Sequence, residues 1–276
     1  MSGVLQGNDW SRLVPPAGST WTPKRTVSVC IPCRNPSHNL ERTLDALALQ
    51  TYPLDLVEVV VADDGSDEPL ELPDRWPFPV RVVRLEPQPG FGAGRARNAA
   101  ARAATGEVLV LLDADVVPEK QVLACYLRWF ETRTDVVAMG LCRFAETGDL
   151  DDEALLALVR TGGLAAHFVG RDVDDQSWRE TTFRATDDLR VESVDAFRIV
   201  VGATFAVSAE RYAAVGGFRE LGIRGIEDTE IGYRLHADGC VLVLDRDADH
   251  WHQGRRTIAA DRRDAIREAR TPYVQR

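Results

Sequence analysis

The stretch G-E-V-L-V-L-L-D-A-D-V-V-P-E, residues 106–119, decides the fold of this chain. Residues 107–112 form a mostly apolar run of strand length, which is typical of a strand buried on both faces of a parallel sheet. Asp113 and Asp115 follow this run directly. The stretch therefore predicts a buried strand whose carboxyl end carries acidic side chains.

Strands and helices are expected to alternate on both sides of this stretch, because apolar runs alternate with helically spaced apolar residues. The expected strands are 26–31, ended by Pro32, 57–62, 80–85, 199–207 and 241–244. The expected helices are 39–50 with Asn39 as N-cap, 93–104, 118–130 with Pro118 in its first turn, 151–161, 208–215, 228–238 and 257–270. This order predicts an α/β fold with a mainly parallel central sheet flanked by helices, and ligands beyond the carboxyl ends of its strands.

A single domain is the simplest organisation for these 276 residues, because the sequence shows no repeat, linker or low-complexity tract. We expect an irregular leader at 1–25 that packs through Trp10 and Trp21, one domain at 26–256, and a C-terminal helix within 257–276. Residues 171–197 are polar and lack a periodicity that would assign them.

Charge and length narrow the class of protein. The formal net charge of −10 argues against nucleic acid as the main partner, because phosphate backbones attract Lys and Arg. Arg95, Arg97 and Arg102 nevertheless cluster, and they either meet a phosphate or form a solvated face. No apolar run approaches the ~20 residues of a transmembrane segment. The first residues also lack the pattern of a secretory signal, so we expect a cytoplasmic protein without a membrane span.

Five cysteines, an odd number, fit reduced thiols in that compartment. Cys30 and Cys33 form a C-x-x-C pair, which is found in redox and zinc sites. No second pair follows at zinc spacing, and Cys30 lies inside an apolar run. We interpret both as buried strand cysteines.

Three acidic clusters stand at the ends of expected elements: Asp63-Asp64, Asp113 with Asp115, and Glu227-Asp228. Asp113 and Asp115 would project to one side of an extended segment, where two carboxylates repel unless a cation or a proton intervenes. Oxygen ligands of this kind suit Mg²⁺ or Mn²⁺. The alternatives are turns, in which Asp is common, and an N-cap role for Asp228.

Five sequence blocks occur in a specific order. They are V-S-V-C-I-P-C-R-N at 27–35, V-V-V-A-D-D-G-S-D at 59–67, the segment from G-A-G-R-A-R-N at 92–98 through D-A-D at 113–115, V-G-G-F-R-E at 215–220, and I-E-D-T-E-I-G-Y-R-L at 226–235. This order resembles family 2 of the inverting glycosyltransferases, over roughly Thr26 to His252. The resemblance implies a single Rossmann-like GT-A domain with a nucleotide-binding half at 26–140 and an acceptor half at 141–256.

By motif match, the resemblance also implies roles for individual residues. The implied nucleotide-binding residues are Pro32, Arg34, Asp63, Asp64, Arg97 and Asp113; the implied metal ligands are Asp115 and His252; the implied catalytic carboxylates are Asp228, as general base, and Glu227. His250 is the alternative to His252 in D-A-D-H-W-H-Q-G-R-R at 247–256. Arg255 and Arg256 either steady the phosphates or are solvated.

The implied reaction moves a sugar from a nucleotide-sugar donor, most commonly a UDP-sugar in the family, to a hydroxyl of a sugar, lipid, peptide or small-molecule acceptor. Mn²⁺ or Mg²⁺ would neutralise the leaving diphosphate, and a carboxylate would accept the proton of the hydroxyl. One direct displacement of this kind inverts the anomeric centre.

Other classes remain as alternatives. A sugar nucleotidyltransferase would need a Gly-rich basic loop after the first strand, where 32–36 reads Pro-Cys-Arg-Asn-Pro. A dehydrogenase would need G-x-G-x-x-G at the same place. A catalytically silent sugar-binding domain would not require all three acidic clusters. The transferase hypothesis therefore ranks first.

Overall fold

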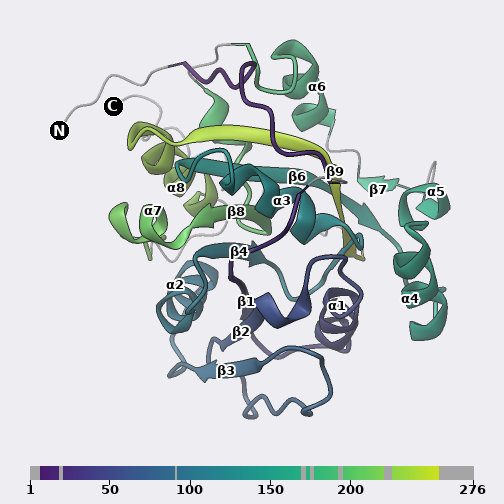
Figure 1. The fold of residues 1–276 in the computed structure, drawn as a ribbon. Coiled ribbons are helices and arrows are strands. Elements are labelled where there is room, and N and C mark those ends of the chain that lie inside the picture. The colour runs from purple at the N-terminus through teal and green to yellow at the C-terminus, as the bar shows by residue number, and fades with distance from the viewer. Residues whose placement is uncertain are drawn as a thin grey trace.

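One continuous sheet runs through the molecule in the strand order β3-β2-β1-β4-β8-β6-β9-β5, with β7 paired to β6 (Figure 1). The computed structural model describes residues 7–18, 21–90, 92–168, 172–174, 177–191, 195–220 and 226–254. The strands are β1 Val27–Cys33, β2 Val57–Asp63, β3 Val80–Arg84, β4 Val108–Leu112, β5 Val116–Pro118, β6 Val136–Ala145, β7 Asp172–Asp174, β8 Thr204–Ser208 and β9 Val241–Gln253. The helices are α1 Asn39–Leu47, α2 Ala93–Ala103, α3 Val122–Phe130, α4 Asp152–Thr161, α5 Leu164–Phe168, α6 Ser177–Ala185, α7 Ala209–Ala214 and α8 Glu227–Ala237, with short 3₁₀ turns at Leu54–Leu56 and Ala196–Ile199.

The two halves of the sheet differ in strand direction. Strands β3, β2, β1 and β4 are parallel, as the sequence predicts. Beyond β4 the sheet is mixed, because β8 is antiparallel to both β4 and β6, whereas β9 is parallel to β6 and antiparallel to β5. Figure 1 shows the parallel strands beside α1 and α2, and β6, β8 and β9 in the other half. The fold is thus a single α/β domain with a mixed sheet.

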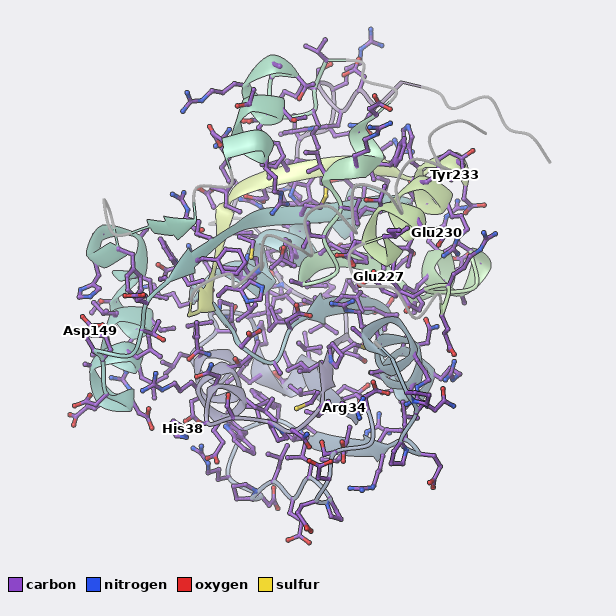
Figure 2. All side chains as sticks on the ribbon, turned by 180° about the vertical axis from the view of Figure 1, so that it is seen from behind. Arg34, His38, Asp149, Glu227, Glu230 and Tyr233 are labelled. Atoms are coloured by element: carbon purple, nitrogen blue, oxygen red, sulfur yellow. The ribbon has the colours of Figure 1, made fainter. Side chains whose placement is uncertain are left out.

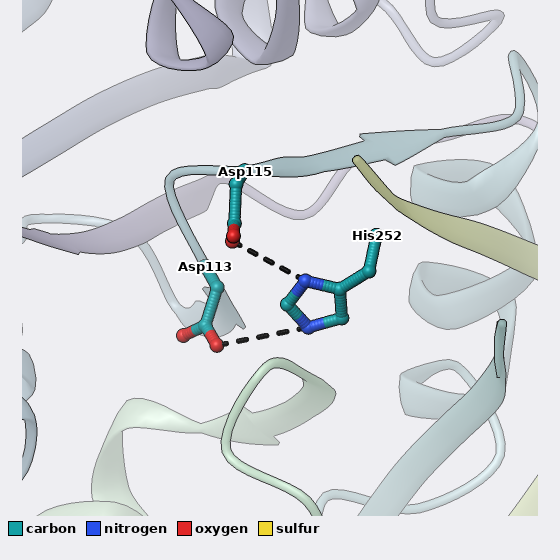
Figure 3. Close-up of side chains that lie close together, drawn as sticks. All are labelled: Asp113, Asp115 and His252. Atoms are coloured by element: carbon teal, nitrogen blue, oxygen red, sulfur yellow. Dashed lines mark ion pairs between the residues drawn. The ribbon is translucent and has the colours of Figure 1, made fainter. Parts of the chain in front are cut away.

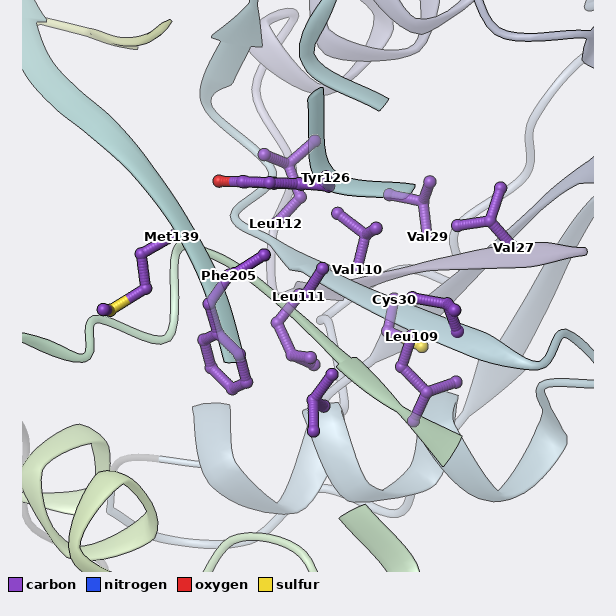
Figure 4. Packing of buried hydrophobic residues seen from close by; sticks show 14 of the residues in the cluster. Val27, Val29, Cys30, Leu109, Val110, Leu111, Leu112, Tyr126, Met139 and Phe205 are labelled. Carbon is purple, nitrogen blue, oxygen red and sulfur yellow. The ribbon is translucent and has the colours of Figure 1, made fainter. Parts of the chain in front are cut away.

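The strands of the sheet are mostly apolar, and helices pack against them. Every residue of β4 is buried, and helix α2 covers β1 and β2 with the small buried side chains of Ala96, Ala99 and Ala100. Figure 4 shows Val27 and Val29 of β1 beside β4, with Phe205 of β8 in the same core. No helix in the described part of the chain is long and apolar enough to cross a membrane.

Two expectations at proline residues are wrong. Pro32 does not end β1; it lies inside the strand opposite Ala62. Its missing N–H is tolerated because the ladder between β1 and β4 already stops at Cys30. Pro118 does not start a helix; it ends β5, opposite His250 of β9, and α3 begins at Val122.

One predicted helix cap, Asn39, is wrong, and so is the alternative in which Asp228 is a cap. Helix α1 begins at Asn39, and its N-cap is His38. Helix α8 begins at Glu227 with Ile226 as N-cap, so Asp228 lies within the first turn. The Asp228 carboxylate pairs with Arg97, which leaves it facing the neighbouring helix α2. A cap is therefore not the role of Asp228.

The N-terminal segment packs against the fold. The buried side-chain amide of Asn8 donates hydrogen bonds to the carbonyls of Leu189 and Leu242, and its oxygen accepts one from the Leu242 N–H. Trp10 meets Trp129 edge-to-face, with ring centres 5.4 Å apart. Residues 7–10 therefore complete the flank of β9. The expected C-terminal helix, with Arg255 and Arg256, lies outside the described residues.

Candidate active site

A cavity of about 420 Å³ opens where β1, β2 and β4 end. Parallel strands end at one edge of a sheet, so the loops that follow them meet there. Six of the residues named from the sequence line it, together with Gly92 and Ala96 of the α2 region: Pro32, Arg34, Asp64, Arg97, Asp113 and Asp115. The size suits a small-molecule ligand.

The adjacent residues Asp63 and Asp64 occupy different environments. Asp63 is fully buried and accepts hydrogen bonds from the N–H groups of Ser66, at 2.8 Å, and Leu70, at 3.4 Å. Arg84 pairs with its second oxygen at 3.1 Å. Asp63 thus holds the loop after β2 and is not among the residues that line the cavity.

Asp64 lines the cavity and is fixed from the side of α2. The guanidinium of Arg95 donates to Oδ1 of Asp64 from Nε, at 3.1 Å, and also from Nη2. A side chain at Gly92 would overlap the Asp64 carboxylate, so only glycine fits there without a shift. Arg95 is therefore part of a mostly buried ion pair and does not belong to a solvated face.

Asp113, Asp115 and His252 converge beside the cavity (Figure 3), and one ligand atom of each lies within 4.8 Å of the others. His252 Nδ1 is 3.3 Å from Asp115 Oδ1, and His252 Nε2 is 3.9 Å from Asp113 Oδ2. The ring stacks on Phe144 at 4.6 Å, which fixes its plane. Two carboxylates and an imidazole form a donor set that fits Mn²⁺ or Mg²⁺.

His250, which lies in β9 two residues before His252, is fully buried. Its Nδ1 is 3.1 Å from the carbonyl of Leu141, and its Nε2 is 3.3 Å from the hydroxyl of Tyr126. Burial lowers the pKa of His250 to about 4. Both ring nitrogens therefore face core partners, whereas His252 faces the acidic pair.

The third acidic cluster, Glu227-Asp228, is linked to Asp113 by the side chain of Arg97. Arg97 is buried, and its Nη2 donates to Asp113 Oδ1 at 2.6 Å, while its Nη1 lies 3.7 Å from Asp228 Oδ1. Burial raises the pKa of Asp228, and the charge of Arg97 opposes that rise. Burial of Arg97 disfavours its charge, but Asp113 and Asp228 outweigh that effect and raise its pKa. Glu227, also buried, starts the helix; Figure 2 shows it with Glu230 and Tyr233 along α8, and Arg34 in the half with β1.

Gly202, which no motif identified, also belongs to this arrangement. A Cβ there would overlap Asp228 Oδ1 and lie 2.8 Å from Arg97 Cζ. Gly202 falls in the segment 199–207 that was expected to be a strand, but β8 begins only at Thr204, so the start of that prediction is wrong. A single glycine there gives no sequence signal, because its role depends on two side chains from other elements. The pairing of Arg95 with Asp64 is similarly visible only in three dimensions.

Comparison with known sequences agrees with this geometry. The sequence profile of glycosyl transferase family 2 matches residues 28–198. A chondroitin synthase of Pasteurella multocida is 30% identical over 82% of this chain, and a validoxylamine A glucosyltransferase of Streptomyces hygroscopicus is 31% identical over 80%. The chain spans 24% and 54% of the lengths of these two relatives.

Solved structures share the fold. A mannosyltransferase of Pyrobaculum calidifontis, in complex with GDP-Man and Mn²⁺, superposes with a TM-score of 0.58 at 21% identity, over 89% of this chain and 60% of that one. GalNAc-T7, with UDP, GalNAc and Mn²⁺, gives 0.57 at 19% identity, over 84% of this chain and 44% of that one. At such identities the likeness concerns the fold.

Proposed function

This chain belongs to glycosyl transferase family 2, and from that membership we propose that it transfers a sugar from a nucleoside-diphosphate donor to an acceptor hydroxyl, with inversion and with the help of a divalent cation. The observation that carries the proposal is the convergence of Asp113, Asp115 and His252 beside the cavity. A leaving diphosphate needs its charge neutralised at such a place.

The cavity is the proposed donor site. Asp64, held by Arg95, would accept hydrogen bonds from the base or ribose, and Arg34 is an exposed cation on the lining. A UDP-sugar is the proposed donor. A GDP-sugar is the second candidate, because the P. calidifontis enzyme of the same fold holds GDP-Man.

Asp113, Asp115 and His252 are the proposed cation ligands. When bound, Mn²⁺ or Mg²⁺ would act as a Lewis acid that stabilises the departing nucleoside diphosphate. Phe144 holds the His252 ring in one plane, and Arg97 holds Asp113 by one oxygen. His252 and Asp113 are therefore oriented before the donor binds, which reduces the reorganisation that transfer requires.

Asp228 is the proposed general base. An acceptor hydroxyl has a high pKa, so a carboxylate that accepts its proton during bond formation lowers the barrier. Asp228 lies in the first turn of α8, where burial raises its pKa and the charge of Arg97 opposes that rise. Glu227, the preceding helical residue, is the alternative base.

A thermal-shift panel tests this proposal. UDP, GDP and their sugars should raise the unfolding temperature, and Mn²⁺ should increase the shift, because ligands stabilise the state they bind. A silent binding domain would show the shift without releasing nucleoside diphosphate from any donor. A nucleotidyltransferase would release pyrophosphate from a nucleoside triphosphate and a sugar phosphate.

A further inference from the structure

Arg97 lies between the proposed cation ligands and the proposed base, Asp228. It donates a hydrogen bond to the cation ligand Asp113 but none to Asp228. Its Nη2 donates to Asp113 Oδ1 at 2.6 Å, while Nη1 is 3.7 Å from Asp228 Oδ1, too far for a hydrogen bond. Within the described residues, Nε and Nη1 of Arg97 and Oδ1 of Asp228 have no hydrogen-bond partner. Buried polar atoms are rarely left so, and here a donor and an acceptor face each other.

The two oxygens of the Asp113 carboxylate have different neighbours. One of its oxygens accepts from Arg97, and the other, Oδ2, lies 3.9 Å from His252 in the group of cation ligands. A cation among these ligands would attract the Asp113 carboxylate and repel the guanidinium, because both effects follow from charge at short distance. The contact between Arg97 and Asp113 should therefore weaken as the cation binds.

We propose that Arg97 is a positioning residue that couples occupancy of the cation site to Asp228. When a cation binds, Arg97 loosens from Asp113 and completes the hydrogen bond to Asp228, which fixes that carboxylate in one orientation. The closing movement is only about 1 Å, since charged N–H···O bonds are about 2.8 Å long. Gly202 leaves the space for it, because no side chain separates Arg97 from Asp228.

This inference rests on the proposed function only where it treats Asp228 as the base; the coupling itself does not need that role. Coupling between two sites is reciprocal, so a change at Asp228 must alter cation affinity. Mn²⁺ alone is therefore a sufficient probe, with neither donor nor turnover required.

The test is a double-mutant cycle on the full chain, with the Mn²⁺ dissociation constant measured by calorimetry. Asp228→Asn should weaken Mn²⁺ binding about fivefold, at the lower end of known couplings. In an Arg97→Gln background the same change should have less than about a twofold effect, because the shared residue is gone. Equal factors in both backgrounds would mean that Asp228 acts on the cation by charge alone, and the coupling would be refuted.

Gly202→Ala provides a second arm if Arg97→Gln does not fold. It keeps all three charged groups and inserts a methyl group between Arg97 and Asp228. Mn²⁺ binding should weaken as in Asp228→Asn, while Gly148→Ala, where a Cβ meets nothing within 4 Å among the described residues, should leave it unchanged. Wild-type Mn²⁺ affinity in folded Gly202→Ala would overturn the proposal.

The two proposals fail separately. If the cycle shows no coupling but Asp228→Asn still abolishes sugar transfer, the coupling is wrong and the base assignment stands. If the coupling is present but Asp228→Asn transfers sugar at the normal rate, the coupling stands and Asp228 is not the base.

Discussion

His252 Nδ1 lies 3.3 Å from Asp115 Oδ1, although the two residues are far apart in sequence. The antiparallel pairing of β5 with β9 brings them together, and the Gln253 N–H donates to the Asp115 carbonyl at 2.9 Å. The short strand β5, which follows Asp113 and Asp115, thus determines where His252 of β9 lies.

The two histidines of β9 should respond differently to substitution. His252→Gln should weaken Mn²⁺ binding at least about tenfold, because groups in or around metal sites typically contribute that much. His250→Gln should lower the unfolding temperature and leave Mn²⁺ affinity near wild type, since His250 contacts Leu141 and Tyr126 in the core. Titration calorimetry with Mn²⁺ measures both, and the opposite ranking would make His250 the ligand.

Asp228→Asn should reduce turnover by about 10²-fold or more, because the amide cannot accept the proton of the acceptor. At saturating Mn²⁺, donor affinity should change little, since Asp228 is not among the residues that line the cavity. Nucleoside diphosphate formation at saturating donor measures the rate. An unchanged rate would shift the base assignment to Glu227.

The same variant should remain folded. Burial raises the pKa of Asp228, so the folded state prefers the protonated carboxyl, and wild-type stability falls as pH rises from 3.8 through the raised value. The asparagine carries no such dependence. Above that window, the free energy of unfolding of Asp228→Asn should equal or exceed that of wild type, as urea denaturation at pH 7 can check.

Substitution of Asp63 should affect the stability of the protein, whereas substitution of Asp64 should affect ligand binding. Asp63→Ala should lower the free energy of unfolding by about 1–3 kcal/mol, because buried N–H groups of the loop lose their acceptor. Asp64→Ala should instead weaken nucleoside diphosphate binding about tenfold while the protein stays folded. Arg84→Ala should lower the free energy of unfolding, as Asp63→Ala does, because Arg84 pairs with Asp63. Arg95→Ala should weaken nucleoside diphosphate binding, as Asp64→Ala does, because Arg95 pairs with Asp64. Loss of binding in Asp63→Ala alone would reverse the assignment.

The N-terminal segment should contribute to global stability. Asn8→Ala removes a buried amide that serves Leu189 and Leu242, and it should cost about 2–3 kcal/mol in urea denaturation. Asp9→Ala is the matched control, because the exposed Asp9 carboxylate accepts hydrogen bonds from Ser11, two residues away in the chain. Equal midpoints for the two variants would show that the segment does not stabilise the fold.

The sequence predicted the parallel half of the sheet well, because its strands are apolar on both faces. The run after Glu107 is β4, and the run at 57–62 is β2 with one residue added. The edge at which Asp64, Asp113 and Asp115 meet also followed from the strand order. Neighbouring strand residues point to opposite faces, which explains why Asp63 faces inward while Asp64 reaches the cavity.

The mixed half was harder to predict. Strand β9 was expected to stop at 244 but continues to Gln253, because two of its acidic residues, Asp245 and Asp249, are buried and paired. Asp245 accepts from Arg128 and Trp129, and Asp249 pairs with Arg143. Strand β6 was not predicted at all, although 136–142 is a mostly apolar run. The strands that pair with these segments are distant in sequence, so the local pattern alone did not assign them.

Release of nucleoside diphosphate tests the central claim most directly. A panel of UDP-sugars and GDP-mannose is incubated with the protein in Mn²⁺ or in EDTA, with water as the default acceptor. At least one donor should release its nucleoside diphosphate in Mn²⁺, the freed sugar should first appear as the inverted anomer by NMR, and EDTA or Asp115→Asn should abolish release. The absence of release from every donor would contradict a metal-assisted glycosyl transfer at this site. So would release in EDTA, or by Asp115→Asn, that equals the release by the wild-type protein in Mn²⁺.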